Sequence, residues 1–175
     1  KYRTIDQRSS IICDQIADHF QQELGVTIDH LQRSCRAKVA DFLTVRSGFE
    51  KFFEINPIDT LFLTNAYGVT TRATLSAAKA SGARVVELQH GFISPYHLGY
   101  SWPGSPEIPD SPDELWCFGA FWPDTTEFAA HTKVRIIGAP YVYRLAREHA
   151  ASRDPKLVVF TSQGVIGRRL FDIAV

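Results

Sequence analysis

The sequence contains no methionine, only three cysteines and no surplus of charge of either sign, since 19 Lys and Arg balance 19 Asp and Glu in 175 residues. A protein that neutralises nucleic-acid phosphates normally carries a basic surplus, so this balance argues against a nucleic-acid binder. No apolar run reaches the roughly 20 residues of a membrane-spanning helix, and no signal peptide opens the chain. We therefore expect a soluble, cytoplasmic protein. Because methionine is absent, Lys1 is not a translation start, and we expect a fragment of a longer chain.

The three cysteines, Cys13, Cys35 and Cys117, are far apart and lack the spacing of metal ligands. This usage is typical of reduced thiols in a cytosolic protein, and we expect no metal site. Hydrophobic residues make up 45% of the chain and aromatic residues 12%, which argues against a disordered chain. We expect a globular domain with its own core.

Residues 1–56 show the spacing of two amphipathic helices. The first has an apolar stripe that recurs every four residues and stops at Gly25. The second is expected to open with a capping box formed by Asp29 and Gln32 and to end before Asn56. Helices of this length need a sheet or further helices to cover.

From residue 57 to residue 150 short apolar runs alternate with helical patterns. The expected strands are residues 60–64, 84–88, 114–119 and 134–138. The expected helices are residues 71–80, 125–131 and 141–149, and a long loop covers residues 92–112. This alternation predicts an α/β fold: a Rossmann-like parallel sheet with helices on both faces, preceded by the two amphipathic helices.

Residues 151–156 are polar and contain a proline, so we expect a linker there that ends a domain spanning residues 1–150. Residues 157–161 have the pattern of another buried strand, and a helix follows from Gly167. The unit 157–175 either opens a second Rossmann-like domain or adds a strand to the first sheet.

The richest candidate site lies at the end of the second expected strand. Ligands of open parallel sheets bind beyond the carboxyl ends of the strands. There the sequence offers Glu87, Gln89, His90 and Gly91. An imidazole titrates near neutral pH, so His90 can take a proton from a hydroxyl group, and Glu87 is its candidate carboxylate partner. The alternatives are a histidine and a glutamate satisfied within the core or the loop.

The same sheet edge carries further candidates for substrate contact. His97 and Tyr100 follow in the long loop, and Tyr67 follows the first expected strand. Gly91 permits a sharp turn and a close approach of a substrate. Simple loop packing is the alternative for Tyr100, and solvation is the alternative for His97.

Ser162, Gln163 and Gly164 form a turn between the last expected strand and its helix. Backbone N–H groups at the start of a helix bind phosphate. The turn has no lysine and no complete glycine fingerprint, so an ordinary strand-to-helix turn is the alternative.

The order Glu87-Leu88-Gln89-His90-Gly91, with His97 and Tyr100, resembles bacterial glycosyltransferases of the GT-B fold that build capsule, O-antigen and similar surface polysaccharides. In that family, an acceptor-side domain with a Gln-His-Gly type element is followed by an Arg-Ile-Ile-Gly-Ala-Pro-like strand and a linker. A donor-side domain then opens with a strand and a Ser-Gln type turn. The later pieces correspond to residues 134–140 and 157–164.

The resemblance covers residues 57–175 and implies transfer of a sugar from a nucleotide sugar to a glycan or lipid-linked glycan acceptor. It implies that His90 faces the cleft as a candidate general base or acceptor-orienting group, and that Ser162, Gln163 and Gly164 lie beside the donor phosphates. It implies no cofactor and no catalytic metal, and enzymes of this kind often work at the inner face of the cytoplasmic membrane. The rest of the donor-side domain is missing, so the fragment is expected to be inactive alone. A nucleotide-sugar 2-epimerase and a non-enzymatic Rossmann-like binding module are the alternatives.

Overall fold

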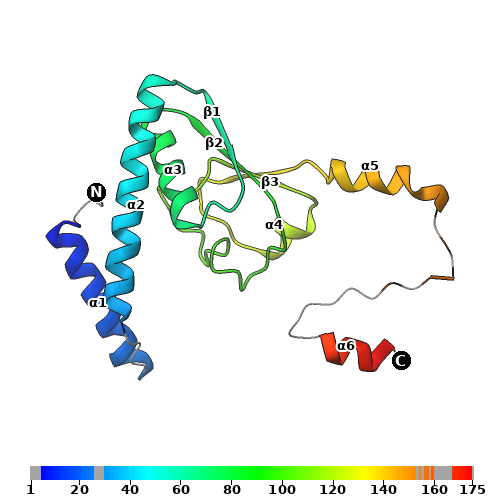
Figure 1. Ribbon diagram of the computed structural model, residues 1–175, viewed down its shortest axis with the longest axis horizontal. Helices are drawn as coiled ribbons and strands as arrows, with labels where there is room; N and C mark the ends of the chain where they lie inside the picture. Colours follow the sequence, from blue (N-terminus) through cyan, green and yellow to red (C-terminus); the bar gives the residue numbers. More distant parts are fainter. Residues whose placement is uncertain are drawn as a thin grey trace. The chain divides into compact units, whose positions relative to one another are not determined.

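The computed structural model describes residues 5–25, 30–152, 154, 156–157, 159 and 167–174 (Figure 1). The chain divides into two compact units, residues 1–138 and residues 139–175, and each is described by itself.

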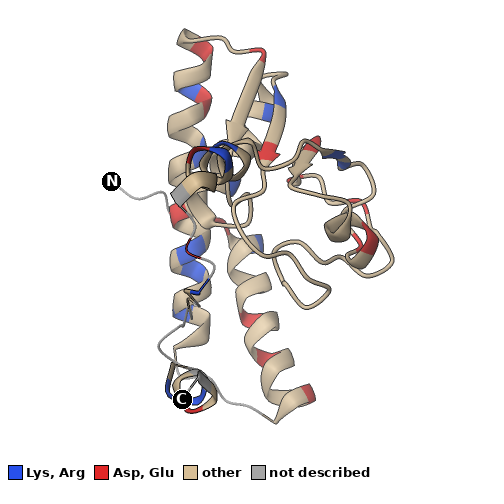
Figure 2. Cartoon of the chain, turned by 90° about the vertical axis from the view of Figure 1, so that its right-hand side faces the viewer, with Lys and Arg blue, Asp and Glu red and all other residues tan. Residues whose placement is uncertain are grey.

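Two helices begin the first unit: α1 (Gln7–Leu24) and α2 (Leu31–Ile55). The Asp6 side chain caps α1 by accepting a hydrogen bond from the Ser9 N–H at 2.7 Å. Acidic side chains predominate on α1 and basic ones on α2 (Figure 2). The Arg36 guanidinium joins the two helices through both oxygens of Asp14, at 2.7 and 2.9 Å.

The start of α2 differs from the predicted capping box. Its N-cap residue is His30, which has a left-handed backbone (φ 66°) and makes no capping hydrogen bond with its side chain. Asp29, which was expected to cap this helix, lies outside the described residues.

The sheet consists of β1 (Thr60–Leu63), β2 (Arg84–Leu88), β3 (Glu114–Cys117) and β4 (Lys133–Ile136). All neighbouring strands are parallel, and their order is β1-β2-β3-β4. Helix α3 (Val69–Ala80) connects β1 to β2, and the short α4 (Phe121–Thr125) lies between β3 and β4. The predicted α/β fold with a parallel sheet is therefore confirmed.

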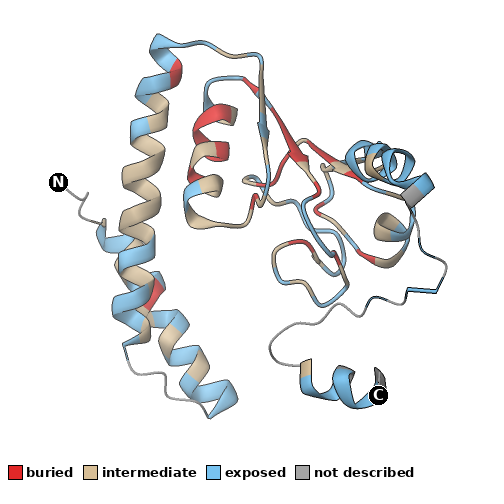
Figure 3. Cartoon of the chain, turned by 45° about the vertical axis from the view of Figure 1, so that its right-hand side comes forward, coloured by how far each residue is buried: buried red, intermediate tan, exposed pale blue. Residues whose placement is uncertain are grey.

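The core fills one face of this sheet in two parts. The first lies beneath α3 and the end of α2, where Phe53, Leu75 and Val85 are buried together (Figure 3). The second lies beneath the long loop between β2 and β3 and contains Ile93 and Leu115. The loop is therefore anchored to the sheet by its own apolar side chains.

Within the described part of the first unit, helices cover one face of the sheet, and helices on both faces stay a prediction. Phe62 on the opposite face is 52% exposed. Its ring meets the Trp116 ring edge to face, with centroids 5.5 Å apart, across the intervening strand β2 and its fully buried Val86. With consecutive strand order, right-handed crossovers all pass over the same face, which explains the one-sided cover.

The helix expected at residues 125–131 is also wrong, because the helix in this region is α4. Thr126 is extended, and the residues after it bond to the long loop instead of winding into a helix. The Glu127 carbonyl accepts from the Trp102 N–H at 2.7 Å, and its carboxylate accepts from the Gly104 N–H at 2.7 Å. Tertiary hydrogen bonds thus override the local helical pattern.

The second unit contains α5 (Pro140–Glu148), a 3-10 turn (Ala150–Ser152) and α6 (Gly167–Ala174). The compact first unit ends at Gly138, ahead of the linker expected at residues 151–156. Residues 158 and 160–166 lie outside the described residues. The predicted phosphate-binding turn of Ser162, Gln163 and Gly164 falls among them and stays a prediction.

Candidate functional site

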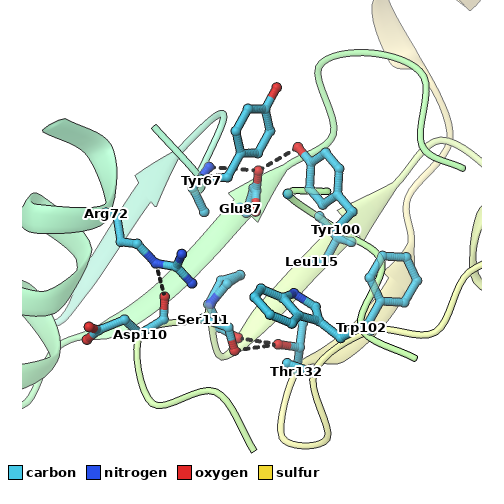
Figure 4. A pocket seen from close by; sticks show the side chains of 14 residues that line it. Tyr67, Arg72, Glu87, Tyr100, Trp102, Asp110, Ser111, Leu115 and Thr132 are labelled. Carbon is cyan, nitrogen blue, oxygen red and sulfur yellow. Dashed lines mark hydrogen bonds between the residues drawn. The ribbon is translucent and has the colours of Figure 1, made fainter. Parts of the chain in front are cut away.

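The candidate site lies where β1 and β2 end and the long loop returns over the sheet (Figure 4). Glu87, near the end of β2, is only 2% exposed. One of its carboxylate oxygens, Oε1, accepts from the Tyr100 hydroxyl at 2.7 Å and from the Ala66 N–H at 3.0 Å. Burial raises the pKa of the Glu87 carboxyl, and these two hydrogen bonds and nearby His90 act against that rise.

Tyr100 links this buried carboxylate to His90. Its oxygen lies 3.3 Å from His90 Nδ1. Because the Tyr100 proton is donated to Glu87, the Tyr100 oxygen can accept a hydrogen bond from Nδ1–H, which leaves Nε2 as the basic nitrogen of His90. Burial, and next the charge of Glu87, raise the pKa of the Tyr100 hydroxyl, so Tyr100 keeps its proton for this bond.

His90 itself is exposed, and β2 has already ended before it. Strand alternation therefore does not hold His90 and Glu87 on opposite faces, and both reach Tyr100. The Tyr67 hydroxyl lies 3.5 Å from His90 Nε2, at the limit of a hydrogen bond. The arrangement is an exposed imidazole connected to a buried carboxylate through one phenol.

An aromatic cluster surrounds this line of hydrogen bonds. The His97 ring lies 5.0 Å from the Tyr67 ring and 4.8 Å from the Tyr100 ring, measured between centroids. Gly99 packs directly on Tyr67: a Cβ atom placed there would lie 2.4 Å from the Tyr67 Cγ. The sequence reasoning missed Gly99, whose only signal was its place between two candidates, His97 and Tyr100.

Gln89 and Gly91 lie near the site, and the hydrogen bonds of the Gln89 side chain support the loop there. Gln89 is buried, its Nε2 donates to the Gly91 carbonyl at 2.8 Å, and its Oε1 accepts from the Phe118 N–H at 2.7 Å. Gly91 has open space where a Cβ would stand, and its φ is outside the left-handed region. Gln89 therefore ties the loop after β2 to the loop after β3.

Beneath the site lies a small cavity of about 30 Å³, lined by Glu87, Tyr100 and residues of the long loop. Arg72 extends toward it from α3, and its Nε donates to the Asp110 carbonyl at 3.4 Å (Figure 4). A volume of this size suits a water molecule or two. A sugar or a nucleotide does not fit there, so a substrate of the size of a sugar must meet His90 from its exposed side.

A second polar cluster, which the sequence reasoning missed, lies at the amino ends of β3 and β4. The His131 ring bridges Glu107 and Ser111, with Nδ1 3.0 Å from the Glu107 carboxylate and Nε2 3.0 Å from the Ser111 hydroxyl. Lys79 reaches the same place from α3, pairs with Asp113 at 3.1 Å and donates to the Ser111 carbonyl at 3.0 Å. Ser111 is buried beside a cavity with no room for a substrate, so the cluster anchors the loop to α3.

Cys117 ends β3 on the covered face. Burial, and then the charge of Glu87, raise the pKa of its thiol to about 11, so it is protonated at neutral pH. Within the described residues, no group of three or more histidine, cysteine, aspartate or glutamate side chains is arranged to hold a metal ion. The helices described here include none that is long and apolar enough to cross a bilayer.

Comparisons of the chain with protein-family models, curated proteins and solved structures gave no significant match.

Proposed function

We propose that this chain is the acceptor-side part of a GT-B glycosyltransferase, acting as one portion of a longer enzyme. The observation that carries the proposal is the hydrogen-bonded line from the buried Glu87 through Tyr100 to the exposed His90. It leaves the basic nitrogen of His90 on the accessible side of the site, at the carboxyl ends of the strands, where open parallel sheets bind their ligands.

In this mechanism an acceptor hydroxyl donates a hydrogen bond to His90 Nε2. As the hydroxyl oxygen forms a bond to the anomeric carbon of the sugar, the bond from that carbon to the phosphate oxygen of the nucleoside diphosphate breaks. The hydroxyl proton moves to Nε2, and the nucleotide leaves as a diphosphate. The imidazolium donates a hydrogen bond from Nδ1 to the Tyr100 oxygen, and the Tyr100 hydroxyl donates to the Glu87 carboxylate. The new positive charge is therefore connected to a carboxylate through one hydroxyl group.

The aromatic rings of Tyr67 and His97 beside His90 offer flat surfaces for a sugar ring. The donor nucleotide is assigned to the portion beyond residue 157, with Ser162, Gln163 and Gly164 as its phosphate contacts. The catalysis needs no resident cofactor, because the nucleotide sugar is itself the activated substrate.

The proposal is tested by His90→Ala in the full-length enzyme, assayed with nucleotide sugars and glycan acceptors. Transfer should fall about 100-fold, the usual contribution of a general base, with an unchanged melting temperature. His19→Ala, at an exposed histidine of α1, is the matched control and should leave transfer unchanged. Normal transfer by a well-folded His90→Ala protein would remove the mechanism, and epimer formation without an acceptor would favour an epimerase instead.

The proposal also requires a donor-side domain in the natural polypeptide. A domain of this kind adds about 100–150 residues. The intact mass of the natural polypeptide should therefore exceed 19.7 kDa by roughly 11–16 kDa or more. A mass close to 19.7 kDa would favour a binding module.

A further inference from the structure

Helix α1 exposes most of its surface, including apolar side chains. Of its residues, all of which the structure describes, only Cys13 is buried (Figure 3). Three large apolar side chains stay at the surface: Ile11 is 48% exposed, Ile12 46% and Ile16 40%. A surface helix normally turns such side chains toward another element of the structure. Within the described part of the first unit, this face of α1 has no such cover.

Four exposed residues form what we call the outer stripe of α1: Arg8, Ile12, Ile16 and Glu23. Their successive spacings of four, four and seven residues keep them on one side of the helix, because a turn takes about 3.6 residues. Asp14, which bonds to Arg36 of α2, stands on the opposite side. The outer stripe thus lies away from this contact with α2, with a base at one end, an acid at the other and two isoleucines between them.

The charged ends of the outer stripe restrict what can cover it. No ion pair within the described residues involves Arg8 or Glu23. The two residues are 15 positions apart, which is about 22 Å along a helix. A partner helix that meets both ends must offer an acid and a base at this spacing. Helices α5 and α6, with 9 and 8 residues, are shorter than that span.

The outer stripe of a second copy has the required pattern. When two α1 helices run antiparallel about a two-fold axis that passes between Gln15 and Ile16, Arg8 of each copy meets Glu23 of the other. The same axis brings the isoleucines of both copies together near its centre. The stripe is therefore complementary to itself in both charge and apolar character.

A shallow hollow at the start of α1 offers the antiparallel pair a further contact. In such a pair, Leu24 of the other copy comes opposite Gln7, and Leu24 is 61% exposed. The hollow would receive this side chain and remove its apolar surface from water. Its lining residues are Asp6, Gln7, Arg8, Ile11, Ile12 and Gln15.

We propose that the chain forms a two-fold dimer through the outer stripes of α1. Ion pairs between Arg8 and Glu23 stand at both ends of the contact, and Ile12 and Ile16 of both copies pack between them. The partner is a second copy because the pattern of the stripe is matched by its own reverse. The proposal does not depend on the proposed function, since α1 carries no residue of the candidate site.

The test is sedimentation velocity of the full-length protein over a range of micromolar concentrations, which should show a monomer–dimer equilibrium. Arg8→Glu and Glu23→Arg should each weaken the dimer about tenfold, because like charges then face each other at both ends of the contact. Both substitutions suit α1 itself, since they place an acid at its start or a base at its end. A weaker dimer therefore does not result from a less stable helix.

A mixture of the two variants distinguishes this contact from any other. Chains with Arg8→Glu and chains with Glu23→Arg are complementary to each other at both ends, so the mixture should form a heterodimer as tightly as the unaltered chain forms its dimer. Asp18→Arg is the matched control. It makes the same change of charge at an exposed position of α1 outside the stripe, and it should leave the dimer unchanged.

Ile12→Ser should also weaken the dimer about tenfold, because it removes an apolar side chain from each copy's half of the contact. Its melting temperature as a monomer should be unchanged, since Ile12 is exposed. A monomer at every concentration would overturn the proposal. A dimer that Arg8→Glu leaves intact, a mixture that forms no heterodimer, or an equal effect of Asp18→Arg and Glu23→Arg would overturn it as well.

Discussion

Glu87 and Glu114 stand on neighbouring strands of one sheet and are almost equally inaccessible, at 2% and 5% exposure. Burial raises the pKa of Glu87. The pKa of Glu114 is lowered to about 2, first by the hydrogen bond from Arg135 and then by the one from Trp116. Burial alone therefore does not set the direction in which the pKa of a carboxyl in this sheet shifts. The hydrogen-bond partners of the carboxyl, above all a charged one such as Arg135, set that direction.

Register explains why the partners differ. Glu87 pairs with Leu115 and so belongs to the covered face, where it finds a phenol and a backbone N–H. Glu114 pairs with Val86 and belongs to the open face, where the long side chains of Arg84 and Arg135 reach it. A shift of one residue would exchange the two environments, because side chains alternate along a strand.

Among the substitutions that test this difference between the two glutamates, Glu87→Ala should change the free energy of unfolding most. The Tyr100 hydroxyl and the Ala66 N–H would lose their acceptor inside the protein, so the free energy of unfolding should fall by roughly 2–3 kcal/mol. Urea denaturation measures this change. Glu54→Ala, at an exposed position of α2, is the control, and an equal effect of the two variants would contradict the assignment.

Gly99→Ala should disturb the surroundings of Glu87 without touching its carboxylate. The added methyl group would collide with the Tyr67 ring, and relief of that collision should cost about 1–2 kcal/mol of stability. Gly91→Ala is the matched control, since its new methyl group meets open space. Equal melting temperatures of the two variants would show that the contact between Gly99 and Tyr67 is not tight.

Tyr100→Phe should have a smaller effect on stability, about 1 kcal/mol, because Glu87 keeps the hydrogen bond from Ala66. Loss of the phenol should raise the pKa of Glu87 further, since that hydrogen bond favours the charged carboxylate. An NMR titration of the Glu87 carboxyl measures the shift. A lower pKa in the variant would contradict the direction of the bond.

The last prediction concerns Glu114→Gln, whose effect on stability should be present at neutral pH and should disappear in acid. The folded pKa of Glu114, about 2, lies below its ordinary value of 4.5. Its contribution to stability is therefore complete above pH 4.5 and is lost as the pH falls toward 2. For Glu87 the sign is opposite: its contribution is complete below pH 4.5 and declines as the pH rises through its raised pKa. Calorimetry of Glu114→Gln should show a flatter melting temperature between pH 4.5 and 2, and an unchanged slope would contradict this account.

The sheet could be predicted from the sequence because each strand is a short apolar run closed by turn residues. The runs at residues 60–64 and 84–88 became β1 and β2 within a residue of their expected bounds. The helix expected at residues 125–131 could not be placed correctly, because Glu127 bonds to Trp102 and Gly104, residues more than twenty positions away. No local pattern carries that information.

The residues of the candidate site could be predicted from the sequence, but the hydrogen bonds between them could not. Glu87, His90 and Tyr100 were all identified from a strand end and its loop. Tyr100 lies between the other two because the loop returns over the sheet, and it is 13 residues from Glu87 in the sequence. Sequence spacing does not reveal that path. Gln89 was expected to contact substrate. Both polar groups of its side chain instead form hydrogen bonds with backbone atoms, which sequence spacing does not reveal.

The consecutive strand order has a consequence for how the chain is made. Each new strand that leaves the ribosome finds its neighbour already synthesised, so the sheet can grow by addition at one edge. By Leu88 the chain already holds β1, β2, α2 and α3, which pack together around one part of the core. The amino-terminal half should therefore acquire its structure first and serve as the template on which β3 and β4 are laid down.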